Sequence, residues 1–246
     1  MSIPPEENTP ERNEDARETA RFDATGDWWE PEGSQRALHD INPVRLDWVE
    51  ACLGGAEGKR ILDVGAGGGL LAEGLARRGA RVLGIDTARQ ALQTAKLHAL
   101  EAEITNVDYR CCTVEELAAE ARRGELEPFD AVTCMEMLEH TPQPASVVAA
   151  CAELVRDGGD ACFSTLNRTL ASYALAILGA EYVLGLLPKG THRHDRFVRP
   201  AELAAWGRES GLALVALQGL GYNPFTRAAW LKRDTAVNYF AHLRKG

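Results

Sequence analysis

A regular alternation of short apolar runs and amphipathic segments between residues 60 and 166 constrains the fold more than any other feature. Strands that alternate with helices over short connections form a parallel sheet with right-handed crossovers. The sequence therefore predicts a doubly wound, Rossmann-like α/β domain. The predicted strands are 60–65, 81–86, 107–111, 129–135 and 160–166, and the predicted helices are 70–78, 88–101, 115–123 and 146–156.

The N-terminal part of the chain lies outside this alternation. Residues 1–30 hold nine acidic and three basic residues, and this polar, acidic composition predicts a disordered tail over residues 1–18. Aromatic and apolar side chains between residues 22 and 49 predict N-terminal helices and loops packed on the edge of the sheet. We therefore expect one folded domain over residues 19–246.

The alternation also breaks after residue 166. Residues 167–196 form an insertion, and Pro200 then opens a helix at the position that proline favours. Two closing strands are expected at residues 212–220 and about 228–239. Together with the five strands before them, they predict a sheet of seven mostly parallel strands.

Charge and cysteine content disfavour several classes of function. The net charge is −9, and no clustered basic stripe marks a nucleic-acid surface. None of the six cysteines forms a C-x-x-C pair, which predicts reduced, mostly buried thiols. No export signal follows Met1, so the cytoplasm is the expected compartment.

A glycine-rich loop joins the first predicted strand to the first predicted helix. It reads Asp63-Val-Gly65-Ala-Gly67-Gly-Gly-Leu70, and glycines there let the backbone turn tightly and approach a ligand closely. Asp86 ends the next strand, where a carboxylate can accept both hydroxyls of a ribose. A dinucleotide fingerprint would need glycine in place of Leu70, and Asp63 would repel a pyrophosphate but attract a cationic aminoacyl group. The loop thus favours a sulfonium nucleoside, S-adenosylmethionine, over NAD.

The fourth predicted strand runs directly into a second polar motif, Met135-Glu136-Met-Leu-Glu139-His140. Ligands bind outside the carboxyl ends of the strands in open parallel sheets. The i, i+3, i+4 spacing of Glu136, Glu139 and His140 brings them together in one helical turn. The residues alone leave three interpretations open: solvated side chains in a loop, a general base at His140 oriented by a neighbouring glutamate, or a Mg²⁺ site formed by all three.

Several longer motifs carry a resemblance to one enzyme family. Asn42-Pro-Val-Arg-Leu46, Cys134-Met-Glu-Met-Leu-Glu-His140 and Pro188-Lys-Gly-Thr-His192 are far more specific than the glycine loop. With further matches, nearly all of residues 20–240 resembles the ubiquinone biosynthesis O-methyltransferases. The further matching stretches are 38–41, 62–69, 95–100, 163–168, 179–183 and 222–224.

The resemblance implies a class I S-adenosylmethionine-dependent methyltransferase. Such enzymes methylate the catechol-type hydroxyls of two polyprenylated ubiquinone precursors, 2-polyprenyl-6-hydroxyphenol and 3-demethylubiquinol. Eukaryotic relatives bind Mg²⁺ through the equivalents of Glu136, Glu139 and His140, which implies the same ligands here. Ala66 replaces the cysteine common in the family's loop, and we expect no functional consequence. The loop and the resemblance together predict six cofactor-binding residues: Arg45, Asp63, Gly65, Gly67, Asp86 and Met135.

Methyl transfer to a phenol needs a base or a metal, because a phenol with a pKa of about 10 is mostly protonated at neutral pH. His140, Glu136 and Glu139 are the candidate catalytic residues for this step. Three rival functions stay open: a related methyltransferase for a soluble phenol or carbon acid, a non-catalytic cofactor-binding scaffold, and a dehydrogenase. The intact motif opposes the scaffold, and Leu70 opposes the dehydrogenase.

The insertion suits a prenylated phenol or quinol as the partner molecule. Residues 170–187 are almost wholly apolar, with Glu181 as their only formal charge. Two interpretations stay open: a substrate lid whose helix is buried against the core, and a lid that also makes a peripheral contact with the inner face of the membrane. Its length and glycines disfavour a membrane span. The resemblance further implies a quinone-biosynthesis protein complex as a partner.

Overall fold

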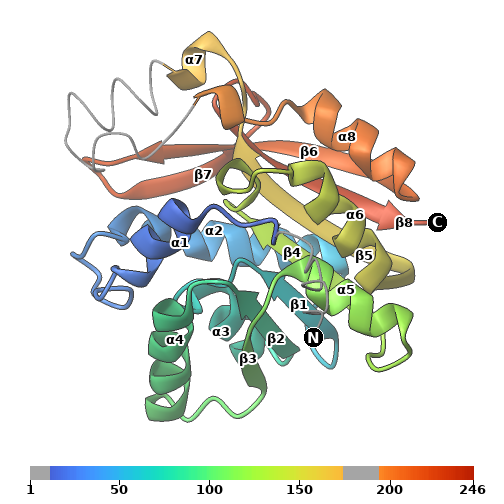
Figure 1. Ribbon diagram of the computed structural model, residues 1–246. Coiled ribbons are helices and arrows are strands. Elements are labelled where there is room, and N and C mark those ends of the chain that lie inside the picture. Colours follow the sequence, from blue (N-terminus) through green and yellow to red (C-terminus); the bar gives the residue numbers. More distant parts are fainter. Residues whose placement is uncertain (1–11, 174–193) are drawn as a thin grey trace, which may run out of the picture.

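The computed structural model describes residues 12–173 and 194–246. Within these residues the strands are β1 (Arg60–Val64), β2 (Arg81–Asp86), β3 (Val107–Cys111), β4 (Phe129–Met135), β5 (Val155–Leu166), β6 (Leu212–Asn223), β7 (Ala228–Lys232) and β8 (Asn238–Lys245). They form one eight-stranded sheet in the order β3-β2-β1-β4-β5-β8-β6-β7 (Figure 1). Neighbouring strands from β3 to β5 are parallel, and β8, β6 and β7 add an antiparallel section beside β5.

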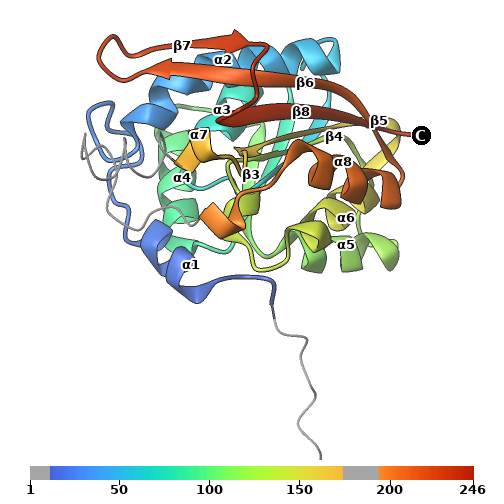
Figure 2. The ribbon, with the colours of Figure 1, turned by 90° about the horizontal axis from the view of Figure 1, so that it is seen from above.

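Helices cover both faces of the sheet. The described helices are α1 (Ala16–Asp23), α2 (Arg36–Leu53), α3 (Leu70–Arg77), α4 (Arg89–Glu101), α5 (Val114–Arg122), α6 (Pro144–Leu154) and α8 (Pro200–Glu209), with the short turns η1 (Leu138–His140), α7 (Leu170–Ser172) and η3 (His194–Arg196). Helices α2, α3 and α4 pack on one face, and α5, α6 and α8 pack on the other (Figure 2). Helix α1 contacts α4. The predicted doubly wound α/β architecture is thus confirmed.

The core forms on both faces of the parallel strands. In β1, Ile61 packs with the cluster that includes α2, α3 and α4, whereas Leu62 packs with α5, α6 and α8. Successive side chains of a strand point to opposite faces, so each face receives its own apolar row. Both side chains are fully buried, and truncating a leucine at such a site to alanine typically costs about 2–5 kcal/mol. Burial on both faces explains why the central strands β1 and β4 are mostly apolar, whereas the edge strand β3 alternates buried and exposed side chains.

The number of strands differs from the expected seven. The last expected strand, about residues 228–239, is divided between β7 and β8. The chain turns between them because Asp234 Oδ1 accepts the N–H of Ala236 at 2.9 Å. Asn167 Nδ2 also donates to the carbonyl of Thr235 at 2.8 Å and ties the turn to the end of β5. This polar turn lets β8 insert between β5 and β6.

The expected tail and insertion fall partly outside the described residues. Residues 1–11 and 174–193 are not described, so the predicted lid over residues 170–187 is described only in its first four positions. Residues 12–18 differ from the expectation of disorder, because Asp15 caps α1 by accepting the N–H of Arg17 at 3.0 Å. No helix in the described parts of the chain is long and apolar enough to cross a membrane.

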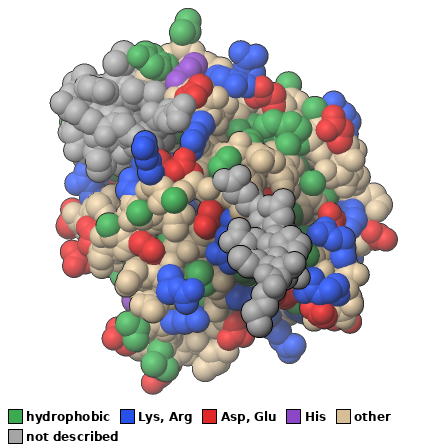
Figure 3. Space-filling model, viewed as in Figure 1, with side chains coloured by type: hydrophobic (Ala, Val, Ile, Leu, Met, Phe, Trp, Pro, Cys, Tyr) green, Lys and Arg blue, Asp and Glu red, His purple; other side chains and the backbone are tan. Residues whose placement is uncertain are grey.

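Basic and acidic side chains are interspersed on the face of the molecule that Figure 3 shows. Many of the charged side chains form ion pairs, as Arg78 does with Asp47 at 2.5 Å and Glu50 at 2.6 Å. Exposed pairs of this kind contribute about 0–1 kcal/mol each. The two buried clusters, rather than the surface charges, therefore dominate the stability of the fold.

Candidate active site

One cavity lies at the carboxyl ends of β1, β2 and β4. From β1 the sheet extends through β2 toward one edge and through β4 toward the other. Such a topological switch point is where open α/β sheets bind ligands. The cavity wall brings together all six residues that the sequence predicts to bind the cofactor: Arg45, Asp63, Gly65, Gly67, Asp86 and Met135.

The glycine loop forms the floor of the cavity between β1 and α3. Gly65 and Gly67 have φ angles of +76° and +51°, in the left-handed region that favours glycine. A Cβ atom at Gly67 would lie 2.6 Å from the ring of Trp28. Trp29 Nε1 donates a 2.9 Å hydrogen bond to the carbonyl of Gly68. The lack of side chains therefore lets the loop pack directly against the two tryptophans.

The Asp86 carboxylate is held in one orientation by the backbone around it. Its Oδ2 accepts the N–H of Gly67 and its Oδ1 accepts the N–H of Ala88, both at 2.8 Å. Burial raises the pKa of Asp86, and these backbone N–H groups oppose that rise. Because a carboxylate oxygen has two acceptor sites, each oxygen keeps one for a ligand. This arrangement suits the two adjacent hydroxyls of a ribose.

A buried carboxylate and a buried guanidinium face the cavity from different elements. Asp63 of β1 accepts a 2.7 Å hydrogen bond from Thr133 Oγ1, and burial raises its pKa to about 6 although Thr133 and Arg45 act against the rise. Arg45 of α2 donates from Nη2 to Asn42 Oδ1 at 3.3 Å. Its Nε is buried without a hydrogen-bond partner among the described residues. An unpaired buried donor is costly, so the pair suits a ligand that brings both a carboxylate and an ammonium group.

This set of groups fits S-adenosylmethionine. Asp86 would hold the ribose hydroxyls, Asp63 the ammonium group and Arg45 the carboxylate. A bound molecule of this kind supplies a methyl group on a positively charged sulfur.

The polar motif after β4 divides between the cavity and the core. Glu136 has a φ angle of +54°, which costs a non-glycine residue about 1–2 kcal/mol. Ser164 Oγ donates to Glu136 Oε1 at 2.9 Å and helps to hold this conformation.

Glu139 is buried, and its Oε2 accepts a 2.8 Å hydrogen bond from Thr165 Oγ1 of β5. Burial and the nearby Glu136 raise the pKa of Glu139 to about 7. Of the three motif residues, Glu136 and His140 line the cavity, whereas Glu139 lies behind its wall.

His140 ends the η1 turn at the cavity wall. Its Nδ1 lies 2.9 Å from Oε2 of Glu18, a residue of α1. The ring of Phe22, also in α1, packs edge-on against the imidazole with centroids 5.2 Å apart. An imidazole held by a carboxylate at one nitrogen can accept a proton at the other. The geometry therefore favours the general-base interpretation of the motif.

The three motif residues do not converge on a common point. Glu136 turns to Ser164, Glu139 to Thr165 and His140 to a residue of α1. Among the residues that the structure describes, no group of three or more His, Cys, Asp or Glu side chains is arranged to hold a metal ion. The side chains as placed do not fit the predicted Mg²⁺ site.

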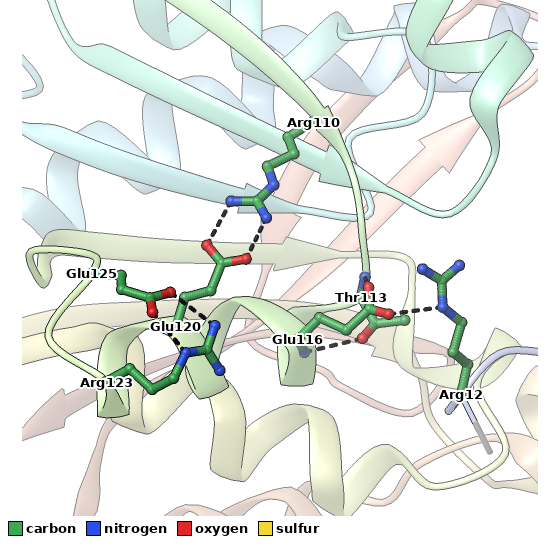
Figure 4. Close-up of polar contacts among 7 residues, drawn as sticks. All are labelled: Arg12, Arg110, Thr113, Glu116, Glu120, Arg123 and Glu125. Carbon is green, nitrogen blue, oxygen red and sulfur yellow. Dashed lines mark hydrogen bonds and ion pairs between the residues drawn. The ribbon is translucent and has the colours of Figure 1, made fainter. Parts of the chain in front are cut away.

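Sequence reasoning missed the contribution of α1 and the residues before it to the cavity. Asp15 followed three residues later by Glu18 is a signature of a helix start, so the helix was detectable. Its docking was not, because it depends on distant partners. Arg12, for example, pairs at 2.8 Å with Glu116, which forms a capping box with Thr113 at the start of α5 (Figure 4). The cavity-lining residues of this segment are Asn13, Glu14, Asp15, Glu18, Thr19 and Phe22.

Comparisons with known proteins show to which family the chain belongs. Residues 37–217 match a family model described as a methyltransferase domain. The chain is 59% identical to the ubiquinone biosynthesis O-methyltransferase of Alkalilimnicola ehrlichii over 242 residues. This alignment covers 98% of this chain and 96% of that protein. It is 51% identical to the protein of the same name from Leptothrix cholodnii, over 95% of this chain and 98% of the relative.

Solved structures share the fold at low sequence identity. The magnesium protoporphyrin IX methyltransferase ChlM of Synechocystis PCC 6803, with bound SAM, superposes with a TM-score of 0.63 at 18% identity, over 93% of this chain and 95% of that one. A SAM-dependent methyltransferase from Aquifex aeolicus gives a TM-score of 0.59 at 10% identity, over 94% and 99% of the two chains. The expected methyltransferase fold is thus confirmed. With its near-full-length relatives, this chain belongs to the ubiquinone biosynthesis O-methyltransferase family.

Proposed function

We propose that this S-adenosylmethionine-dependent O-methyltransferase acts on the catechol-type hydroxyls of 2-polyprenyl-6-hydroxyphenol and 3-demethylubiquinol. The observation that carries the proposal is that His140 shares one cavity wall with Arg45, Asp63 and Asp86. The groups that suit an adenosine with an amino-acid end therefore line the same cavity as a basic imidazole. The names of the relatives place the family in ubiquinone biosynthesis.

The protein's chemical task is to produce a phenolate next to the methyl donor. His140 takes the proton of the catechol hydroxyl as that oxygen attacks the methyl carbon. The carbon–oxygen bond forms while the carbon–sulfur bond breaks in line, the electron pair stays on sulfur, and the proton passes from the imidazole to water. The site must hold the oxygen about 3–3.5 Å from the methyl carbon before the reaction.

The remainder of the cavity wall suits an aromatic ring. Phe22, Leu38 and Met137 contribute apolar side chains to it. Methionine adapts to irregular shapes and makes favourable contacts with rings. These side chains support a planar phenol as the acceptor.

Mg²⁺ remains the alternative means of activating the hydroxyl, as the family resemblance implies through Glu136, Glu139 and His140. Its ligands would have to turn away from Ser164 and Thr165 to meet at one ion. A methylation assay on a demethylated, prenylated quinol, with and without a chelator, separates the two routes. We expect turnover to survive chelation, and loss of activity restored by added Mg²⁺ would support the metal instead.

The same assay tests the acceptor. Activity on the prenylated quinol is the expected result. Activity confined to soluble phenols would make the chain a related small-molecule methyltransferase. Cofactor binding without methyl transfer to either acceptor would make it a non-catalytic scaffold.

We also propose that residues 170–187 cover the substrate and rest on the inner face of the membrane. Leu170 and Tyr173, the apolar residues described at its start, are exposed. Deleting residues 170–187 should weaken flotation with liposomes, and unchanged flotation would contradict the contact. A place in a quinone-biosynthesis protein complex rests on the family resemblance alone, and co-purification with other enzymes of the pathway would test it.

A further inference from the structure

The imidazole of His140 is held by a carboxylate from a distant part of the chain. Glu18 lies 122 residues away in sequence, and its Oε2 is 2.9 Å from Nδ1 of His140. The two side chains are 21% and 15% exposed, so the contact is largely shielded from water. Glu18 also pairs with Arg21 on the next turn of α1 at 3.2 Å. The carboxylate is therefore fixed from its own helix as well as by the imidazole.

The direction of this hydrogen bond follows from the charge of Glu18. Its Oε2 also contacts the guanidinium of Arg21 at 3.2 Å, and a guanidinium can only donate hydrogen bonds, so the side chain of Glu18 is a charged acceptor there. An ionised carboxylate has no proton to donate, so Nδ1 of His140 must carry the proton and donate it. In the neutral imidazole this selects the tautomer whose basic lone pair lies on Nε2.

The helix that carries Glu18 is tied to three separate parts of the molecule. Asp15 Oδ2 accepts a 2.8 Å bond from Arg196, beyond the insertion. Just before the helix, Asn13 Nδ2 donates to Glu115 Oε1 of α5 at 2.8 Å and to the carbonyl of Gln143 at 2.9 Å. These contacts set the position of α1 over the cavity. The carboxylate consequently reaches His140 only when α1 is in place.

We propose that Glu18 is a positioning residue that selects the Nδ1-protonated tautomer of His140, and that the docking of α1 beside the cofactor cavity is what holds Glu18 in this place. This inference rests on the proposed role of His140 as the general base. In a base held in this way, the carboxylate orients the ring and stabilises the imidazolium that forms when the proton is taken. Glu18 needs no contact with the reacting atoms for this role.

The test compares Glu18→Gln and Glu18→Asp with the unaltered chain. An amide both donates and accepts, so glutamine no longer selects one tautomer, whereas aspartate keeps the charge. We expect Glu18→Gln to lower kcat about 10-fold to 100-fold while the dissociation constant for S-adenosylmethionine stays within about twofold. Glu18→Asp should restore part of the lost rate. Arg17→Gln, on the exposed side of the same helix, serves as the control and should retain the normal rate.

Two further measurements separate positioning from a general structural role. Nitrogen NMR of histidine-labelled protein should show His140 protonated at Nδ1 in the unaltered chain and a mixture of tautomers in Glu18→Gln. In a His140→Ala background, Glu18→Gln should lower kcat no further, because residues that act as a unit are not additive. A normal kcat in Glu18→Gln, an unchanged tautomer, or an equal loss in the His140→Ala background would each overturn the proposal. An unaltered chain inactive on prenylated quinols would instead contradict the proposed function, and the NMR readout would still decide the role of Glu18.

Discussion

Thr133 and Asp63 are register partners on the adjacent parallel strands β4 and β1, and the Thr133 hydroxyl donates a 2.7 Å hydrogen bond to Asp63 Oδ1. Both side chains are fully or almost fully buried. The hydroxyl is the principal group that offsets the burial of the Asp63 charge. The ability of Asp63 to meet a cationic ligand therefore depends on its neighbour in the sheet.

Replacing Thr133 by valine should weaken cofactor binding. Valine keeps the branched shape but removes the donor, so the charged form of Asp63 becomes less favourable. A hydrogen bond to a charged group contributes about 1.5–3 kcal/mol, and we expect the dissociation constant for S-adenosylmethionine at pH 7 to rise at least 10-fold by calorimetry. Thr133→Ser keeps the hydroxyl and should bind nearly normally. Equal affinities for the valine and serine variants would show that the hydroxyl is not needed.

Replacing Asp63 by asparagine should weaken cofactor binding and raise the free energy of unfolding of the ligand-free protein at pH 7.5. The pKa of Asp63 rises from 3.8 to about 6 on folding, so the folded state binds more protons than the unfolded state between these values. The free energy of unfolding of the ligand-free protein therefore falls as the pH rises through this window, by roughly 3 kcal/mol from this group. Asp63→Asn should lose that dependence, unfold at higher urea concentration at pH 7.5, and bind the cofactor weakly. Urea unfolding of both proteins at pH 4 and at pH 7.5 measures how their free energies of unfolding change with pH. A variant less stable than the unaltered chain at pH 7.5 would refute the prediction.

The cofactor half of the site could be predicted because sequence and topology coincide there. Asp63, Gly65 and Gly67 are nearly contiguous in sequence, and Asp86 ends the neighbouring strand β2. Since the carboxyl ends of parallel strands meet at one edge of a sheet, finding the strands is enough to bring these residues together. Arg45 joined the set only through the family resemblance, because nothing in its local sequence shows that α2 turns it toward the cavity.

The catalytic half could be predicted less well, for two physical reasons. The i, i+3, i+4 spacing assumed an α-helical turn, but Glu136 has a positive φ angle and only Leu138–His140 forms a short 3₁₀ turn. Glu139 therefore turns into the core instead of joining its neighbours. Glu18 could not be found from local patterns, because its meeting with His140 depends on how α1 docks across the finished sheet.

The strained backbone of Glu136 can be tested by comparing the stability of its alanine and glycine variants. Glu136→Ala removes the carboxylate and keeps a side chain in the left-handed conformation, whereas Glu136→Gly removes both the carboxylate and the strain. The glycine variant should be more stable than the alanine variant by about 1 kcal/mol in urea unfolding, because glycine adopts positive φ angles without steric cost. If the carboxylate is used in the reaction, both variants should lose turnover to a similar degree. An alanine variant as stable as the glycine variant would show that the backbone has relaxed out of this conformation.

Cys52 should be the most reactive thiol of the protein. The contact with Cys162 and the nearby His242 lower the pKa of Cys52 below that of an ordinary thiol, although burial opposes this shift. His242 is itself held by Asp160 Oδ1, 2.8 Å from its Nε2. The thiolate of Cys52 therefore forms at lower pH than that of an ordinary thiol, so alkylation by iodoacetamide should accelerate at a pH below about 8.5. Peptide mapping by mass spectrometry should find Cys52 labelled ahead of the other cysteines. His242→Ala should move this acceleration to higher pH, whereas labelling that begins only above pH 8 in the unaltered chain would show that the neighbouring groups do not stabilise the thiolate.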